Sequence, residues 1–158
     1  SHIKDEDSVN LYIADNYIKV ETKEGTIISR LIEGNFPNYE QVIPDSCDVK
    51  VECKTDELGN AVKRASIIAK TDSNVIELEF KDDTLTIHGK GETNTATEKV
   101  NIDKQGDDMK INLDAGFLLD GLKALESDTV ELLMIDKLNP LTIKEDGFTY
   151  IVMPMRAD

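Results

Sequence analysis

The sequence lacks any long hydrophobic run. Its apolar stretches are short enough for strands, such as residues 151–153, whereas a helix that crosses a membrane needs about 18 or more consecutive apolar residues. A transmembrane helix and a membrane partner are therefore not predicted. The amino terminus also lacks an initiator methionine and an apolar signal region. Ser1 and His2 are typical of the remnant of a cleaved expression tag, so we expect the folded part to start at Ile3.

Cysteine and histidine are scarce, with two of each in the chain. Cys47 and Cys53 are too few for a disulfide framework, and no second Cys or His pair completes a zinc pattern. Reduced thiols are the favoured interpretation, and a disulfide between the two is the less favoured one. Reduced thiols predict a cytoplasmic protein, and the sequence predicts no metal and no other cofactor.

Basic residues are outnumbered, with 18 Lys and Arg against 32 Asp and Glu and a net charge of −14 at pH 7. This charge opposes any chain-wide attraction to phosphate, so contact with nucleic acid would need a locally concentrated basic face. The rest of the composition, 39% hydrophobic and 32% charged, is that of a soluble globular protein. The length of 158 residues suits one domain and a piece of another.

Catalytic patterns are absent where they would be expected. His88 precedes Gly89 in a predicted strand and has no nearby Ser, Cys or Asp pattern. Residues 89–92 are too short for a phosphate loop and indicate a hairpin turn. Acidic pairs at 82–83 and 107–108 fall in predicted turns, which Asp favours. We therefore predict no catalytic residue, and a hydrolase with carboxylates assembled across the fold remains only as a third alternative.

An internal repeat is the most informative pattern that is present. Residues 51–65 align without gaps on residues 111–125, so that Leu58 and Val62 fall on Leu118 and Leu122. In both copies an apolar spacing of two changes to a spacing of three and four, which predicts a strand followed by an amphipathic helix. Three short alternating segments follow each helix, at 75–80, 84–87 and 95–102 and at 130–135, 141–143 and 148–153. Each copy is therefore predicted to be a β-α-β-β-β unit.

Residues 9–31 resemble the end of the same unit, with three strands and no helix before them. A lone three-stranded sheet has too little to bury, so we interpret it as the end of an upstream domain of the same kind. The predicted organisation is a tag remnant at 1–2, strands and linker of the upstream domain at 3–45, with the linker at 33–45, and a complete domain at 46–158. The predicted fold class is α+β, with two helices packed on antiparallel sheets.

The first predicted helix, at about 56–69, carries a basic face. Its apolar stripe is Leu58, Ala61, Val62, Ala65, Ile68 and Ala69. On the opposite side lie Lys63, Ile67 and Lys70, with Arg64 at the edge and no acidic partner in the pattern. DNA contact would occur here, although a solvated surface face is the favoured interpretation of this pattern alone. Exposed Ile67 indicates a contact surface. The second helix, at about 115–126, presents Asp120 and Lys123 outward.

The sequence ends in a strand that runs into Met153, Pro154 and Met155. Flexible thioethers around a proline suit an adaptable apolar groove, and completion of the core is an equally weighted alternative. The segments SRLIEGNFPNY at 29–39, VIP at 42–44 and VMPMR at 152–156 together resemble the bacterial DNA polymerase III beta subunits, the sliding clamps. The resemblance covers essentially the whole chain after residue 2, as the end of the middle domain and the complete last domain.

The resemblance implies the DNA clamp fold and a processivity function. Each subunit of that family has three similar domains, each made of two β-α-β-β-β copies, and two subunits close head to tail around duplex DNA. It implies contact with phosphates but not with bases, which lets the ring slide without sequence specificity. It also implies peptide partners, namely the DNA polymerase III alpha subunit, the clamp loader and repair proteins. The alternative is an acidic, non-catalytic protein-interaction domain without DNA contact.

The resemblance further implies three sets of site residues. The DNA-facing set is Lys63, Arg64, Lys70 and Lys123, and the subunit interface of the homodimer contains Ile67 and Ile68. The peptide-binding cleft is lined by Pro37, Gln41, Val42, Asp114, Phe117, Leu138, Pro140, Ile151, Val152, Met153, Pro154, Met155 and Arg156. Asp114 stands where the family has Asn, and Gln41 where Arg is frequent. The family's Gly-His-Arg-Leu stretch has no counterpart in this sequence, so weaker peptide affinity is expected.

Overall fold

The computed structural model describes residues 8–35, 38–44 and 46–156. The chain forms two units, which divide between Asn38 and Tyr39, and each is considered by itself. The division falls within the segment 33–45 that the sequence predicts as a linker, and this segment includes a short 3₁₀ helix, η1 (Tyr39–Gln41). The expected tag remnant at 1–2 and the cleft residue Pro37 lie outside the described residues.

The smaller unit is a three-stranded antiparallel sheet, as predicted. Its strands pair in sequence order as β1 (Asn10–Ile13), β2 (Tyr17–Glu21) and β3 (Thr26–Arg30). The register aligns Leu11 with Val20 and Ile27, and Ile13 with Ile18, so these apolar side chains share one face. Leu11 is 58% and Ile13 75% exposed, so this apolar face is largely uncovered.

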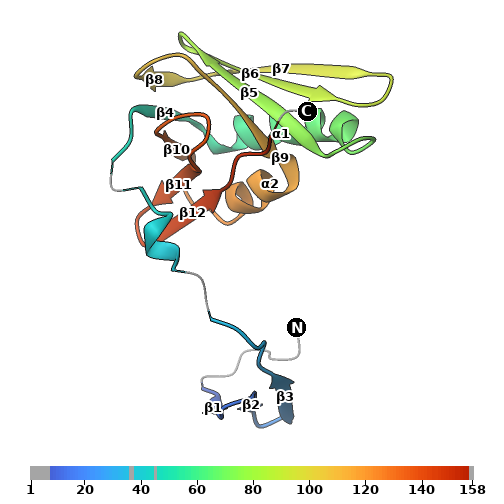
Figure 1. Cartoon of the computed structure of the whole chain (residues 1–158), viewed down its shortest axis with the longest axis vertical. Helices are drawn as coiled ribbons and strands as arrows, with labels where there is room; N and C mark the ends of the chain where they lie inside the picture. The colour runs from blue at the N-terminus through green and yellow to red at the C-terminus, as the bar shows by residue number, and fades with distance from the viewer. Residues whose placement is uncertain (1–7, 36–37, 45, 157–158) are drawn as a thin grey trace. The chain divides into compact units, whose positions relative to one another are not determined.

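Among its described residues, the larger unit contains two α-helices and two antiparallel sheets in addition to η1 (Figure 1). The first copy of the repeat is β4 (Val49–Lys54), α1 (Thr55–Ala69), β5 (Val75–Lys81), β6 (Thr84–Lys90) and β7 (Thr95–Asn101). After β8 (Asp103–Gln105), the second copy is β9 (Met109–Asp114), α2 (Ala115–Lys123), β10 (Thr129–Met134), β11 (Leu141–Glu145) and β12 (Phe148–Val152). The predicted order of elements is confirmed. Several predicted bounds were wrong. α2 ends at Lys123 and not near residue 126, β6 extends to Lys90 and not residue 87, and the strand predicted at 95–102 is interrupted at Ile102, while the other bounds differ by one or two residues.

The two copies exchange their first strands. β4 pairs with β10 of the second copy and β9 pairs with β5 of the first, which gives the sheets β12-β11-β10-β4-β8 and β7-β6-β5-β9. Val51 faces Leu132 in one sheet, and the equivalent residues Ile111 and Leu78 face each other in the other. The repeat therefore extends to the register of the strands, and neither copy completes a sheet alone.

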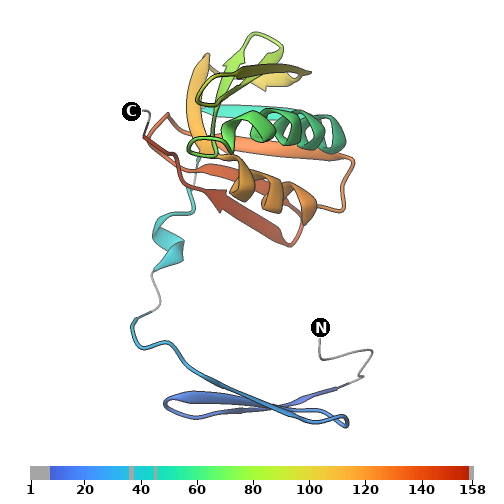
Figure 2. The ribbon, with the colours of Figure 1, turned by 90° about the vertical axis from the view of Figure 1, so that its right-hand side faces the viewer.

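The helices lie side by side against these sheets (Figure 2). α1 packs on β5, β6 and β7, and α2 packs on β9 and β12. The buried stripe of α1 differs from the predicted one, because Ser66 is buried and Ile68 is only half-buried. The Ser66 hydroxyl donates to the Lys63 carbonyl at 2.8 Å, which satisfies its hydrogen bond inside the core.

One apolar core unites both copies of the repeat. Its largest fully buried side chains include Phe80 and Leu58 from the first copy and Leu118 and Leu132 from the second. Cys53 belongs to this core as a free thiol, and burial raises its pKa to about 12. Cys47 is also a free thiol, but it is exposed. Neither cysteine forms a disulfide, in line with the favoured interpretation of the sequence.

Gly89 of β6 allows the sheet to approach α1 closely, because a Cβ at this position would collide with the main-chain carbonyl of Ala65. Helix backbone cannot rotate away as a side chain can, so we expect Gly89→Ala to lower the free energy of unfolding by about 1–3 kcal/mol. Urea denaturation measures this change. Gly59→Ala is the control, since nothing lies within 4 Å of the added methyl group. It should be neutral or stabilising by up to about 1 kcal/mol, and equal losses in both variants would contradict the close approach.

Candidate nucleic-acid and peptide interfaces

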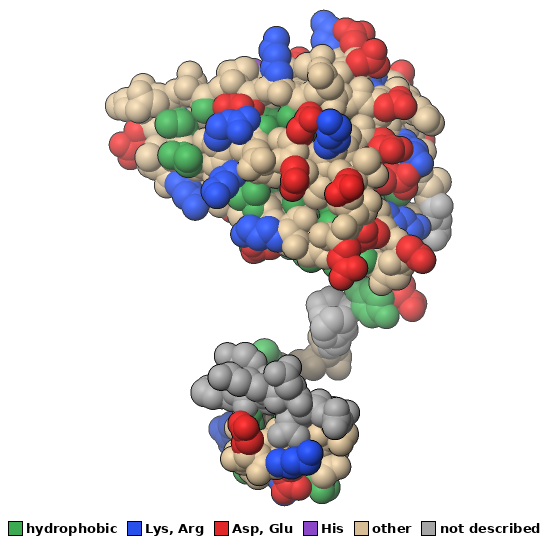
Figure 3. Space-filling model, turned by 180° about the vertical axis from the view of Figure 1, so that it is seen from behind, with side chains coloured by type: hydrophobic (Ala, Val, Ile, Leu, Met, Phe, Trp, Pro, Cys, Tyr) green, Lys and Arg blue, Asp and Glu red, His purple; other side chains and the backbone are tan. Residues whose placement is uncertain are grey.

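The outward side of α1 carries exposed Lys63 and Arg64, and exposed Lys70 forms its C-cap. Lys63, Ile67 and Lys70 occupy positions i, i+4 and i+7, so they share one face of the helix. On one face of the larger unit, several basic side chains lie among apolar ones on one half, and acidic side chains are more numerous on the other half, where some basic ones also lie (Figure 3). The surface therefore combines local basic regions with a strongly negative total charge.

Arg64 has an acidic partner, and the expectation that it has none was wrong. Its Nη2 and Nε donate to Oε2 of Glu98 in β7 at 2.6 and 2.9 Å. This hydrogen bond raises the pKa of Arg64 and lowers the pKa of Glu98. Helical periodicity could not reveal the pair, because Glu98 reaches the helix through strand pairing.

The three predicted lysines differ in their surroundings. Lys123 Nζ lies 3.2 Å from Asp120 Oδ1, one turn earlier on α2. Within the described ranges, no carboxylate lies at ion-pair distance from Lys63 or Lys70. These two lysines are therefore the members of the predicted DNA-facing set whose ammonium groups stay available for an outside anion.

The start of α2 and the segment around Met155 both lie beside β9. Asp114 caps α2, with Oδ1 accepting the N–H groups of Gly116 at 2.7 Å and Phe117 at 3.1 Å. Phe117 is 61% exposed, which is unusual for such an apolar side chain. The Met155 N–H donates to the Asn112 carbonyl at 2.7 Å. The structure thus brings the predicted cleft residues Asp114 and Met155 to the same end of β9, next to the helical turn that carries Phe117.

A hollow opens beside this contact. Of the predicted cleft residues, Met155 and Arg156 line it, together with residues that sequence reasoning missed, namely Asp72, Ser73, Val75, Glu77, His88, Lys90 and Asn112. They come from the loop after α1 and from the outward faces of β5, β6 and β9. His88 Nε2 lies 3.7 Å from Glu79, and its Nδ1 lies 3.3 Å from the Thr97 hydroxyl, as suits a residue on a strand surface. For the missed residues that lie in strands, the alternation of inward and outward positions was the only sequence signal, and Asp72 and Ser73 in the loop had none.

A second group of predicted cleft residues lies at the end of the β11–β12 pair. Leu141 and Val152 form the pair at this end of the ladder. Pro140, just before Leu141, and Met153, just after Val152, therefore lie next to each other beyond it. Pro140 and Val152 are buried, Ile151 and Pro154 are half-buried, and Met153 is 57% exposed. Val152 is thus a core residue of this chain, while Met153 offers its thioether to solvent.

Leu138, on the loop before β11, is 77% exposed. The Asp136 carboxylate holds this loop by accepting the N–H groups of Leu138 at 2.7 Å and Asn139 at 2.9 Å. The same bonds lower the pKa of Asp136. Val42 is also exposed, and Gln41 lies in η1.

The predicted interface residues lie near a free sheet edge. Ile67 is 62% exposed and Ile68 is half-buried near the end of α1. α1 packs on β7, which is an edge strand of its sheet among the described residues. Exposed apolar surface beside an edge strand with unpaired backbone groups is typical of a protein–protein contact.

The described residues contain no group of three or more His, Cys, Asp or Glu side chains arranged to hold a metal ion. None of the helices in the described part of the chain is long and apolar enough to cross a membrane.

The chain is similar to known proteins over most of its length. The family described as DNA polymerase III beta subunit, C-terminal domain, matches residues 40–156, which is more than half of the chain. The chain belongs to this family. The beta sliding clamp of Staphylococcus aureus strain Mu50 is 28% identical in an alignment 158 residues long, which covers 96% of this chain and 42% of that protein. The chain thus spans less than half the length of the curated relatives it matches.

Solved structures of DNA polymerase III beta subunits share the fold. The Pseudomonas aeruginosa beta subunit has a TM-score of 0.85 at 28% identity, covering 94% of this chain and 42% of that one. The Thermotoga maritima beta subunit has a TM-score of 0.83 at 25% identity, covering 98% of this chain and 43% of that one. The resemblance and the clamp fold predicted from the sequence are confirmed.

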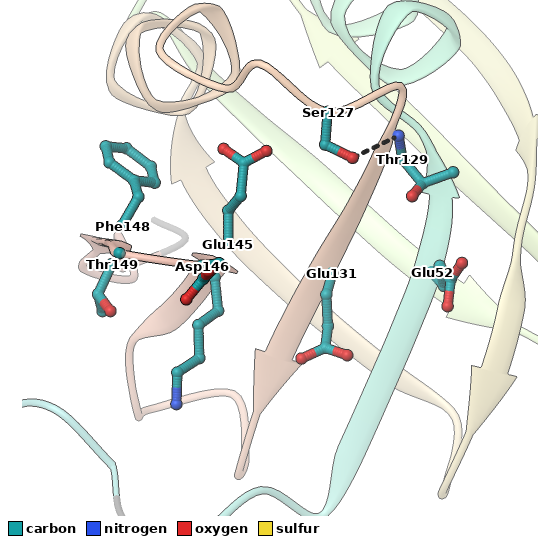
Figure 4. A pocket seen from close by; sticks show the side chains of 10 residues that line it. Glu52, Ser127, Thr129, Glu131, Glu145, Asp146, Phe148 and Thr149 are labelled. Atoms are coloured by element: carbon teal, nitrogen blue, oxygen red, sulfur yellow. Dashed lines mark hydrogen bonds between the residues drawn. The ribbon is translucent and has the colours of Figure 1, made fainter.

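This member of the DNA polymerase III beta subunit family has a second hollow, on the outer side of the five-stranded sheet (Figure 4). Glu52 and Glu131 face each other across β4 and β10, and Glu145 and Asp146 lie at the β11–β12 end. Lys50 forms an ion pair with Glu131. None of the predicted site residues lines this hollow. Its carboxylates give the outer strand surface a negative character that opposes phosphate contact.

The Arg64–Glu98 pair predicts a pH dependence of stability. The folded pKa of Glu98 lies below its ordinary value, so the pair stabilises the fold above the ordinary glutamate pKa of about 4.3. That contribution is lost as the pH falls through the lowered folded pKa. We expect the Tm difference between the unsubstituted chain and Glu98→Gln to be largest near neutral pH and to decline below about pH 4.

Thermal denaturation followed by circular dichroism measures this difference. Glu92→Gln is the control, because Glu92 is exposed in a turn and makes no ion pair with another described residue. It should show no such pH-dependent difference. A Tm difference for Glu98→Gln that stays constant with pH would contradict the ion-pair contribution.

Proposed function

We propose that the chain is the carboxyl-terminal part of a sliding clamp, with the end of the middle domain at 3–45 and the last domain at 46–158. In this proposal the full-length protein is a non-catalytic, cytoplasmic processivity factor for DNA polymerase III, closed as a homodimeric ring around duplex DNA. One observation carries the proposal. In a strand-exchanged repeat of this family, Lys63 on α1 and Lys70 at its C-cap have no ion-pair partner among the described residues, and α1 lies beside the equivalent helix α2. The match to the family does not favour the alternative of an interaction domain without DNA contact.

Phosphate contact follows from the charges on these elements. Unpaired lysines release counterions when they approach the DNA backbone, which favours binding without sequence preference. Arg64 contributes less than the sequence pattern suggested, because Glu98 already holds its guanidinium. The carboxylates on the outer side of the five-stranded sheet repel DNA from that side. Few and salt-sensitive contacts suit a ring that must move along the duplex.

The predicted cleft residues bind short linear peptides of the polymerase alpha subunit, the clamp loader and repair proteins in this proposal. Exposed Phe117, Leu138, Met153 and Met155 supply apolar surface for the anchors of such a peptide. Methionine side chains adapt to different anchors because they are flexible and polarizable. Asp114 and Arg156 add polar contacts at the rim, and Ile67 and Ile68 belong to the contact with the second subunit.

NMR titration of the chain with a short duplex DNA tests the DNA-facing set. In about 20 mM salt, where screening is weak, we expect amide shifts at Lys63, Ile67 and Lys70 that disappear on addition of salt. Lys63→Ala/Lys70→Ala should abolish these shifts, while Lys144→Ala, at an exposed position of β11, should leave them in place. Shifts confined to the outer strand surfaces would contradict the assignment.

Methyl NMR tests the peptide cleft with controls inside the same molecule. The four methionines include Met134, which is fully buried, and Met109, which packs against the core. Titration with a short peptide from the clamp-binding segment of a DNA polymerase III alpha subunit should shift the methyl signals of Met153 and Met155. The signals of Met109 and Met134 should stay in place. Unchanged Met153 and Met155 signals at millimolar peptide would remove the cleft from the proposal.

A further inference from the structure

We propose that Asn74 is a positioning residue for the peptide cleft. It holds the first turn of α2, and with it Phe117, in the position that receives an apolar anchor of the peptide. This inference rests on the proposed peptide-binding function. Asn74 itself has no role in the sequence prediction, because its position in a loop gives no chemical sign of one.

The backbone of Asn74 joins the two helices. Its N–H donates to the Ala69 carbonyl at the end of α1, at 2.9 Å. Its carbonyl accepts the N–H of Ala115, the first residue of α2, at 3.0 Å. The loop between α1 and β5 is thereby fixed to the beginning of the second helix.

The side chain of Asn74 acts on the helix cap. Its Nδ2 donates to Asp114 Oδ1 at 3.0 Å, the same oxygen that accepts the N–H groups of Gly116 and Phe117. Three donors on one oxygen fix the orientation of the capping carboxylate, and the carboxylate fixes the first turn of the helix. The turn is tightly packed, because a Cβ on Gly116 would lie 3.0 Å from Asp114 Oδ1 and 3.4 Å from Asn74 Nδ2.

Asn74 bears two costs in this position. Its φ of 59° is left-handed, a conformation that asparagine tolerates better than most residues but less readily than glycine. Its Oδ1 is buried without a hydrogen-bond partner among the described residues, which is unfavourable for a polar atom. Strained or incompletely satisfied groups of this kind concentrate at functional sites. Glycine at this position would avoid both costs, but it would lose the hydrogen bond to Asp114.

The neighbours of Asn74 belong to the cleft. Ser73 and Val75 line the hollow that Met155 and Arg156 also line. Asn112, two residues before the capping Asp114, accepts the N–H of Met155. A shift of the first turn of α2 would therefore move Phe117 relative to Met155. Binding sites lose function when such supporting contacts leave the side chains about 1 Å out of place.

Peptide affinity in substituted chains tests the proposal. Asn74→Gly removes the side-chain donor and keeps the left-handed φ at no steric cost. We expect it to weaken binding of the polymerase alpha-subunit peptide by about three- to tenfold, the range for one lost hydrogen bond. Isothermal titration calorimetry measures the affinity, at a temperature at which all variants are folded. In the absence of peptide, the NMR signals of the Gly116 and Phe117 amides should differ between this variant and the unsubstituted chain.

Asp82→Gly is the matched control. Asp82 is the other non-glycine residue with positive φ in the described chain, at 49°, and it lies in the β5–β6 turn. The same backbone change there should leave peptide affinity within about twofold, since no contact with the cap is altered.

Asn74→Asp is a second variant, which keeps the size of the side chain but directs an acceptor at Asp114. Its affinity loss should exceed that of Asn74→Gly at pH 7. The loss should lessen at lower pH, because a proton shared between two neighbouring carboxylates removes their repulsion. A lowered Tm with unchanged affinity in both Asn74 variants would overturn the positioning role while leaving the cleft in place. Absence of peptide binding to the unsubstituted chain would instead overturn the proposed peptide site, and the role of Asn74 with it.

Discussion

The exchange of first strands between the two copies of the repeat is the constraint on which the rest of the larger unit depends. β4 and β9 each pair with the other copy, and each leads directly into a helix. Each helix therefore starts from a strand that belongs to the sheet of the other copy, and the two helices lie against each other. The outward face of α1, the capping Asp114 at the start of α2 and the exposed Phe117 all take their places from this pairing.

The same arrangement reconciles a net charge of −14 with contact to a polyanion. Carboxylates such as Glu52 and Glu131 lie on the outer side of a sheet. Lys63 on α1 and Lys70 at its C-cap have no carboxylate at ion-pair distance in the part of the chain that the structure describes. Glu98 removes Arg64 from the set of free cations. In the proposed ring, holding DNA then depends more on topological enclosure than on affinity, so a small number of lysines suffices.

The order of elements was predictable because it follows from the local spacing of apolar residues. Apolar residues at periods of two and of three to four specify strands and helices, and the repeat confirmed each assignment with a second copy. The exchange itself was not predictable, because either pairing buries the same residues. Ser66 was missed because a helical pattern does not show that its hydroxyl reaches the Lys63 carbonyl.

The candidate site was predictable only in part. The family resemblance named Asp114, Phe117 and Met155, but Asp72, Ser73 and Asn112 carry no chemical mark in the sequence and meet only in the folded chain. Arg64 and Glu98 likewise form a pair across two elements that no local pattern connects. Residues that act through tertiary contact, Asn74 above all, become visible only when the loop after α1 is seen against the start of α2.

The two cysteines have unlike environments, and this difference gives the chain a practical property. Thiol reagents attack the thiolate, which is scarce for Cys53 at neutral pH because its pKa is raised to about 12 and its side chain is buried. Cys47 is exposed just before β4. A maleimide dye or spin label therefore couples at Cys47 alone, without any engineered substitution. The label then provides a spectroscopic reporter just before the first strand of the larger unit.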